Sequence, residues 1–191
     1  MNQNSLLQQL RETTAPLHEQ IEQKNPAQAI LEHSMDLATY KLLLQQNYAA
    51  YGPLEAQIAP FLPFYKADKA ARLLRDLEAL NAVPLLEAED FQIRSVAEAF
   101  GAAYVLEGSA LGGMLIAKHL PQCEQLKGLP PQQFFSGDKA SLHPWKLFQQ
   151  ELAAQVFEEA EIQALLAKAR ETFLFFERSF EAGSVLAERN A

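Results

Sequence analysis

Four histidines are the first candidates for chemistry in this chain: His18, His33, His119 and His143. No two of them have the spacing of a helical metal motif such as His-Glu-x-x-His, so a zinc site is not indicated. His18 differs from the others because Glu22 follows four residues later, on the same face of a helix. An imidazole that binds a metal usually donates its second ring N–H to such a carboxylate. His18 is therefore a candidate single-histidine metal ligand, although an ordinary surface His–Glu pair explains the same spacing.

A second unusual feature is the segment from Tyr104 to Met114, which contains Gly108, Gly112 and Gly113 within a strongly helical context. Glycine inside a helix costs up to about 1 kcal/mol relative to alanine, so the three together cost roughly 2 to 3 kcal/mol. Gly108 and Gly112 are four residues apart and leave one helix face without side chains. That face could pack closely against another helix, or it could form a flat wall against a planar ligand. A phosphate loop is not indicated, because no strand precedes the segment and the Gly-Lys-Ser/Thr ending is absent.

These residues must be positioned by helices, since apolar residues recur at helical spacing almost throughout and strand-like alternation is hard to find. The pattern predicts an all-α, compact, multi-helix fold. Pro16 interrupts the first helix, which either bends there or gives way to a new helix near Thr14. Residues 121–144 are rich in proline and glycine and are predicted to be irregular. The predicted helices run from about Leu6 to Ile21, Asp36 to Ile58, Lys66 to Leu80, Ala88 to Leu120, Trp145 to Phe157 and Glu159 to Glu188.

Length and composition limit the class of protein. With 191 residues, of which 49% are hydrophobic, the chain is expected to form one domain over residues 1–191. The 16 basic and 24 acidic residues give a net charge of −8, which disfavours nucleic acid as a partner. Basic residues could still gather around an anionic small molecule. The single cysteine, Cys123, excludes an internal disulfide and is typical of a reducing compartment. The start of the chain does not resemble a signal peptide, and no run of 18 apolar residues occurs, so we expect a cytoplasmic protein without a membrane span.

Two motifs together resemble the heme oxygenase family, and its bacterial branch in particular, including the biliverdin-forming enzymes that accompany bacteriophytochromes. The first motif is LRETTAPLHEQIE, from Leu10 to Glu22, and the second is LEGSALGG, from Leu106 to Gly113. In that family a histidine of the first helix is the proximal heme ligand, and a glycine-rich, kinked helix covers the distal face of the heme. The resemblance spans the chain in the order and length of its helices. It implies an enzyme that opens heme to biliverdin, ferrous iron and carbon monoxide, with heme as both cofactor and substrate.

Carried over by position, the resemblance assigns a role to each matching residue. It makes His18 the iron ligand and Glu22 the carboxylate that supports it. The distal wall and catalytic segment correspond to Gly108, Ser109, Gly112 and Gly113. The remaining heme-binding residues are Arg11 and Lys146 as propionate contacts, Tyr104 in the pocket and Phe173 as a ring-packing aromatic.

One position departs from the animal-type enzymes of the family. They carry an aspartate directly after the first distal glycine, where it orders a water molecule, and this chain has Ser109. Bacterial members commonly lack the aspartate too, so activity is still expected, with the distal water organised by Ser109, Glu107 or backbone carbonyls.

The family's chemistry also implies partners. An electron donor such as a ferredoxin or a flavoprotein reductase is needed, and a bacteriophytochrome is a candidate acceptor of biliverdin. Three alternatives stay open from the sequence. They are a non-catalytic heme- or bilin-binding protein of the same fold, an enzyme of different chemistry on this fold, and a helical interaction protein without a ligand.

Overall fold

The computed structural model describes residues 3–85 and 91–189, and within them it contains helices and no strand. The all-helical prediction is confirmed. Three 3₁₀ turns, Leu120–Gln122, Glu124–Leu126 and Lys139–Leu142, lie in the segment predicted to be irregular. The α-helices are α1 (Gln3–Lys24), α2 (Gln28–Leu31), α3 (Leu37–Ile58), α4 (Lys69–Ala79), α5 (Val96–Gly108), α6 (Ala110–His119), α7 (His143–Ala154) and α8 (Glu159–Arg189).

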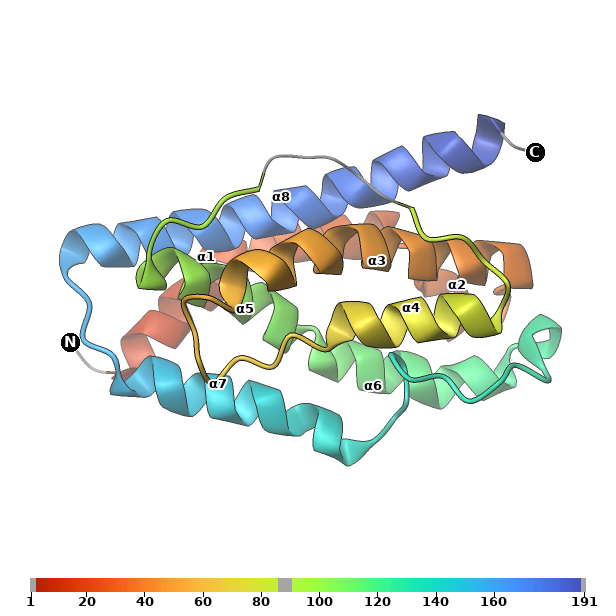
Figure 1. Cartoon of the computed structure of the whole chain (residues 1–191), viewed down its shortest axis with the longest axis horizontal. Helices are drawn as coiled ribbons and strands as arrows, with labels where there is room; N and C mark the ends of the chain where they lie inside the picture. Colours follow the sequence, from red (N-terminus) through yellow and green to blue (C-terminus); the bar gives the residue numbers. More distant parts are fainter. Residues whose placement is uncertain (1–2, 86–90, 190–191) are drawn as a thin grey trace.

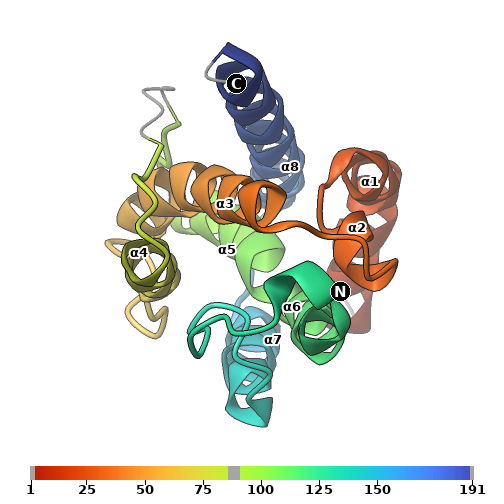
Figure 2. The ribbon, with the colours of Figure 1, turned by 90° about the vertical axis from the view of Figure 1, so that its right-hand side faces the viewer.

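Helix α5 is the centre of the fold. It packs against α8, α3 and α7, while α8 runs along the length of the molecule and also contacts α1 and α3 (Figures 1 and 2). The buried face of α5 is built mostly from small residues, which allow neighbouring helices to approach closely. The closest approach is at Gly101, where an added Cβ would lie only 2.2 Å from the carbonyl oxygen of Leu165 in α8. Gly101 is therefore the glycine that a helix crossing requires.

Replacing Gly101 with alanine is expected to destabilise the fold by roughly 3 kcal/mol or more, because backbone of α8 must move to admit the methyl group. Gly52 in α3 is the matched control, since an added Cβ there meets nothing within 4 Å. Gly52→Ala is expected to change stability by less than about 1 kcal/mol, because the gain in helix propensity is offset by the crowding of a Cβ directly before Pro53. Chemical denaturation of both variants measures the difference. Equal stabilities would contradict the close crossing.

The start of α5 corrects the prediction of one helix from Ala88 to Leu120. Residues 86–90 lie outside the described residues, and α5 begins only at Val96. Ser95 caps the helix, because its hydroxyl accepts the N–H of Glu98 at 3.2 Å, and Glu98 in turn accepts the N–H of Arg94 at 2.8 Å. This reciprocal cap makes Ser95 a helix boundary.

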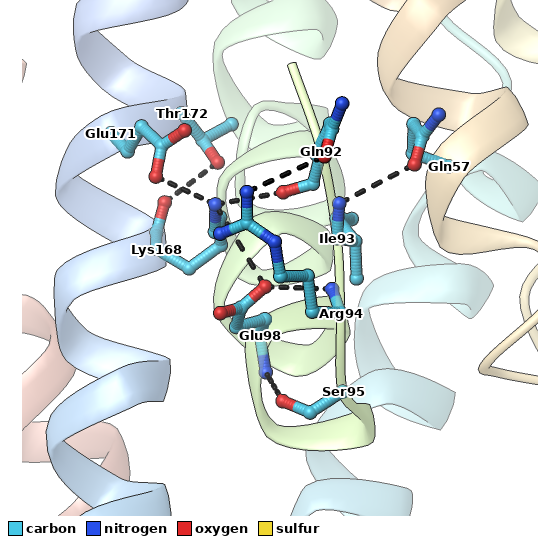
Figure 3. A network of polar contacts seen from close by, with 9 residues as sticks. All are labelled: Gln57, Gln92, Ile93, Arg94, Ser95, Glu98, Lys168, Glu171 and Thr172. Atoms are coloured by element: carbon cyan, nitrogen blue, oxygen red, sulfur yellow. Dashed lines mark hydrogen bonds and ion pairs between the residues drawn. The ribbon is translucent and has the colours of Figure 1, made fainter.

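Lys168 of α8 joins the start of α5 to the rest of the bundle (Figure 3). Its ammonium group donates to the carbonyl of Gln92 at 2.8 Å and to Glu171 at 2.6 Å, and it lies 3.9 Å from Glu98. It also sits 5.0 Å above the ring of Phe91. This network fixes the direction from which α5 enters the core.

The other helix boundaries follow the prediction with small shifts. α3 begins one residue after Asp36, whose carboxylate accepts the N–H of Thr39 at 2.7 Å. That hydrogen bond lowers the pKa of Asp36. Pro16 lies inside α1 without ending it. Of the two possibilities that the sequence left open, the structure has one continuous helix and not a new helix near Thr14. α4 starts three residues later than predicted and α7 ends three residues earlier, at Ala154.

The stretch Val96–Gln122 is long and apolar enough to cross a membrane by length and composition alone. Half of its most apolar window is buried inside the protein, and it is divided between α5 and α6. Buried core helices have the same composition, and α5 is packed on three sides by other helices. The α5 part of the stretch is therefore explained by its place in the core, whereas α6 has no buried residue.

Candidate functional site

A cavity of about 970 Å³ lies between α1 and the junction of α5 and α6. Both α1 and α5 pack on α8, and residues of both helices line the cavity. The volume is at the upper end of the range for small-molecule sites and accommodates a large planar ligand. All but one of the sequence-predicted site residues line it: Arg11, His18, Glu22, Tyr104, Gly108, Ser109, Gly112, Gly113 and Phe173.

His18 projects from α1 to the cavity, and its side chain is 60% exposed. Its Nδ1 atom lies 3.4 Å from a carboxylate oxygen of Glu22. The ring meets Phe173 of α8 edge to face, with 5.9 Å between the ring centres. Among the described residues nothing bonds to Nε2. If Nδ1 carries the proton and faces Glu22, the lone pair of Nε2 is free to bind a metal.

The glycine-rich wall is bare. An added Cβ at Gly112 would meet nothing within 4 Å, and at Gly108 and Gly113 it would find only ordinary contacts at 3.9 Å. These contacts are side-chain atoms of Trp145 in α7 and of Phe135, and no backbone of another described helix lies within 4 Å, so a close helix crossing does not account for these glycines. Because Gly112 borders the cavity, the missing side chain leaves room for a ligand. Of the two interpretations left open by the sequence, close packing against another helix is not observed at Gly112.

The wall bends at Ser109, where α5 ends and α6 begins. The hydroxyl of Ser109 donates to the carbonyl of Leu106 at 2.8 Å, and its oxygen lies 2.8 Å from the hydroxyl of Tyr51 in α3. Since Ser109 uses its proton on Leu106, Tyr51 is the donor in the second bond. Burial raises the pKa of Tyr51, which keeps this donor protonated. The bend is thus held by a hydrogen bond from a residue far away in sequence.

Directly before the bend, Glu107 is 3% exposed and forms a buried ion pair with Lys69 of α4, with 2.5 Å between Nζ and Oε1. Glu55 of α3 accepts the backbone N–H groups of Lys69 and Ala70 at 3.0 and 2.8 Å, which caps α4. Burial raises the pKa of Glu55, and these two N–H groups oppose that rise. Helices α3, α4 and α5 are therefore tied together beneath the glycine wall.

Two buried polar atoms on the cavity wall have no partner. They are Oε2 of Glu107 and Nε of Arg72, in α4. Both residues lie close enough to Tyr51 to shift its pKa, Glu107 upward and Arg72 downward. Buried polar atoms in native proteins are almost always hydrogen-bonded, so this corner of the cavity is prepared for water or for a polar ligand atom.

Replacing Lys69 with methionine is expected to destabilise the fold by about 3 to 5 kcal/mol, because Glu107 then stays buried without its cation. Lys66 offers a matched control: it also lines the cavity and pairs with Asp68, but its side chain is 77% exposed. Lys66→Met is expected to change stability by less than about 0.5 kcal/mol. Thermal unfolding of the two variants compares them, and a small effect of Lys69→Met would show that Glu107 has another partner.

A narrow groove of about 280 Å³ borders His18 on the outer side of α1, and Arg11 and Tyr104 both line it. Arg11 has no hydrogen bond or ion pair with any described residue, so its charge is available to an anion. Lys146 is the exception among the predicted site residues: it is exposed and does not line the cavity. Its neighbour Trp145 lines the cavity instead, stacked on Phe148. Consecutive residues of a helix point in directions about 100° apart, so Trp145 and Lys146 face different sides of α7.

The sequence did not single out several residues that complete the cavity, namely Tyr51, Lys69, Arg72, Phe134, Phe135, Trp145, Phe176 and Phe180. Most come from α3, α4 and α8 or from the irregular segment before α7, and no local motif marks them. A lysine and a glutamate that pair across 38 positions give no signal in a single sequence.

Comparisons with known proteins agree with this geometry. Residues 4–182 match the family model described as heme oxygenase. The solved structure of NO- and CO-bound heme oxygenase from Neisseria meningitidis is similar, with a TM-score of 0.73 and 17% sequence identity over 93% of this chain and 91% of that one. Among curated protein sequences there is no match. The match to the family model covers nearly the whole chain, and the chain therefore belongs to the heme oxygenase family.

Proposed function

We propose that this heme oxygenase binds heme in the cavity between α1 and the α5–α6 junction and opens it to biliverdin, ferrous iron and carbon monoxide. The observation that carries the proposal is the pairing of a free imidazole nitrogen on one wall with a bare glycine face on the other. Heme, when bound, supplies the iron on which oxygen is activated and also the ring that is oxidised. The protein has to bind and orient the heme and to exclude water from the cavity.

His18 is proposed to be the iron ligand through Nε2. Glu22, 3.4 Å from Nδ1, holds the ring in the tautomer that leaves Nε2 unprotonated. Phe173 meets the imidazole edge to face and limits its rotation. A neutral histidine donates less electron density than a thiolate, and a thiolate would favour cleavage of the oxygen–oxygen bond.

On the other wall, Gly108, Gly112 and Gly113 let the α5–α6 junction lie close to the ring plane. Ser109, bonded to Tyr51 and Leu106, is proposed to fix the bend rather than to hold a water molecule itself. The unpaired Oε2 of Glu107 and Nε of Arg72 are the groups suited to order a water molecule there. They would take the place of the aspartate that animal-type enzymes carry at the position of Ser109.

Arg11 is proposed to bind a propionate, since its guanidinium is unpaired among the described residues and stands at the edge of the cavity beside His18. Tyr104 lines the same edge and can donate a hydrogen bond. Anchoring the propionates fixes the rotation of the ring in its plane, and this rotation determines which meso carbon is oxidised. Lys146 contributes to this anchoring only if α7 moves, so we assign the role first to Arg11.

The reaction consumes electrons, and we infer that a ferredoxin or a flavoprotein reductase of the cytoplasm supplies them. The single buried thiol of Cys123 is consistent with that compartment. The likeness of the motif around Gly108 to bacteriophytochrome-associated enzymes supports a bacteriophytochrome as acceptor of the biliverdin. Residues 1–191 are proposed to act as one domain.

The test is to add hemin to the purified protein, record its spectrum, and then supply ascorbate or a ferredoxin system in air. We expect a histidine-ligated heme spectrum that gives way to the broad absorption of a bilin. Binding without loss of the heme bands would identify a heme carrier instead of an oxygenase. Failure to bind hemin would reject the site.

A further inference from the structure

A second pair of histidines meets on the surface, away from His18. His33, in the turn after α2, is exposed, and His119, the last residue of α6, is half-buried; 2.9 Å separates Nε2 of His33 from Nδ1 of His119. The ring centres are 5.2 Å apart and the ring planes differ by 22°. The distance between the ring centres is about equal to the N···N distance plus the distance from each of the two nitrogens to the centre of its own ring. The rings therefore meet end to end in an N–H···N bond.

The backbone holds both histidines in place. His33 has a left-handed conformation with φ of 57°, fixed by its N–H bond to Ile30 and by the bond from Ser34 to Ala29. The buried thiol of Cys123 contacts the carbonyl oxygens of Ile30 and His119, at 3.7 and 3.9 Å. It therefore packs between the two segments that carry the imidazoles. Ligands that are already held together lose little freedom when they bind.

We propose that His33 and His119 form a binding site for a divalent first-row transition metal ion. Imidazole nitrogen is a preferred ligand for such ions, and the proton between the two rings marks the place where both lone pairs converge. The nitrogens need to tilt and separate by a few tenths of an ångström to share a tetrahedral ion, which the exposed side chain of His33 and the partly exposed side chain of His119 allow. No group of three or more His, Cys, Asp or Glu side chains forms a metal site within the described residues. Water molecules therefore complete the coordination.

The site has a consequence for the cavity. Leu31 of α2 and Ile116 of α6 line the cavity wall, and they lie two and three residues from the paired histidines. A metal ion across the pair would join α2 to the end of α6, where the two elements already touch. It would therefore stabilise one end of the heme cavity and raise the midpoint of thermal unfolding.

Two sources would supply the ion. One is ferrous iron released when heme is opened, which rests on the proposed function, and the other is a divalent ion from the surrounding solution. Zn²⁺ is the probe for the site itself, because it binds imidazole more tightly than Fe²⁺ and does not depend on the reaction.

The experiment titrates heme-free protein with Zn²⁺ against a chromogenic chelator. His33→Asn removes one ligand while keeping a residue that tolerates the left-handed backbone, and His119→Ala removes the other. His143→Ala is the matched control, since His143 is exposed and does not pair with any other histidine in the described part of the chain. We expect one Zn²⁺ per wild-type chain, an affinity lower by about tenfold or more in His33→Asn and His119→Ala, and no change in His143→Ala.

Equal zinc affinities in wild type, His33→Asn and His119→Ala would overturn the site, and so would the absence of zinc binding by the wild type. A second measurement assigns the source of the ion. During heme turnover, ferrozine should capture the released iron more slowly from wild type than from His33→Asn if the pair holds it. Equal capture rates would reject released iron as the source while leaving the zinc result, and with it the site, unaffected.

Discussion

Replacing His18 with alanine is expected to abolish the spectrum of histidine-ligated heme and to weaken heme binding by at least about tenfold. The reason is geometric: within the described residues, His18 is the only histidine that lines the cavity, and its Nε2 atom has no other partner. No neighbouring imidazole can replace it. Absorption spectroscopy during hemin titration measures the change.

Addition of imidazole provides the control for this variant. His18 is 60% exposed in the heme-free protein, so its removal leaves a space that free imidazole can enter from solution. The spectrum and part of the turnover are therefore expected to return with imidazole. His143→Ala, at the exposed start of α7, should bind hemin like the wild type. A variant that lacks His18 and still shows the wild-type spectrum would place the iron ligand elsewhere.

Glu22 allows a finer test of the same wall. Glu22→Gln keeps the length of the side chain and a hydrogen-bond acceptor but removes the charge that stabilises the proton on Nδ1. We expect the histidine-ligated spectrum to persist in this variant, with a higher reduction potential of the bound iron. Since the carboxylate is 69% exposed, the shift should be small.

The sequence was most informative where short-range chemistry sets the structure. The helix from Asp36 is marked by a local cap, and the structure places its start one residue later. The i, i+4 spacing of His18 and Glu22 survives in the structure because both lie on one unbroken helix. In these cases the residues that determine the structure are neighbours in the chain.

Features that depend on distant partners were not predictable. The break at Ser109 is held by Tyr51, 58 positions away. Helical periodicity alone predicts one continuous helix there, and only the family resemblance implied a kink. Trp145 lines the cavity and Lys146 does not, because of how α7 is rotated against α5. The sequence pattern of α7 does not determine this rotation to within one residue. The buried pair of Lys69 and Glu107 joins two helices whose contact no local motif indicates.

The glycines show the same distinction most clearly. Gly101 and Gly112 both occur in apolar helices, and sequence alone assigns them equal costs. Gly101 is required by the backbone of α8, whereas Gly112 has empty space before it. One glycine therefore serves folding, and the other is proposed to serve the ligand.

This difference between the two glycines leads to the second prediction with a large expected effect, which concerns the substitution Gly112→Leu. A leucine at this position projects into the cavity from the wall opposite His18, so it is expected to block heme binding or to reduce turnover by about a hundredfold or more, which corresponds to roughly 2.7 kcal/mol. The heme-free variant should fold normally, because a Cβ added at this position meets nothing within 4 Å and the side chain continues from open space. Hemin titration and unfolding measurements on the same samples separate the two properties.

Gly112→Ala sharpens the comparison, since it adds only a methyl group. Alanine is favoured over glycine in a helix by up to about 1 kcal/mol, so this variant should be more stable than the wild type without heme. Its methyl group still stands where the proposed ring plane approaches, and the affinity for hemin should fall while stability rises. Opposite changes in stability and heme binding are the signature of a glycine kept for a ligand, because a glycine kept for packing, such as Gly101, loses stability when it is replaced. If Gly112→Leu bound and degraded heme like the wild type, the bare face would have to serve something other than the distal side of the heme.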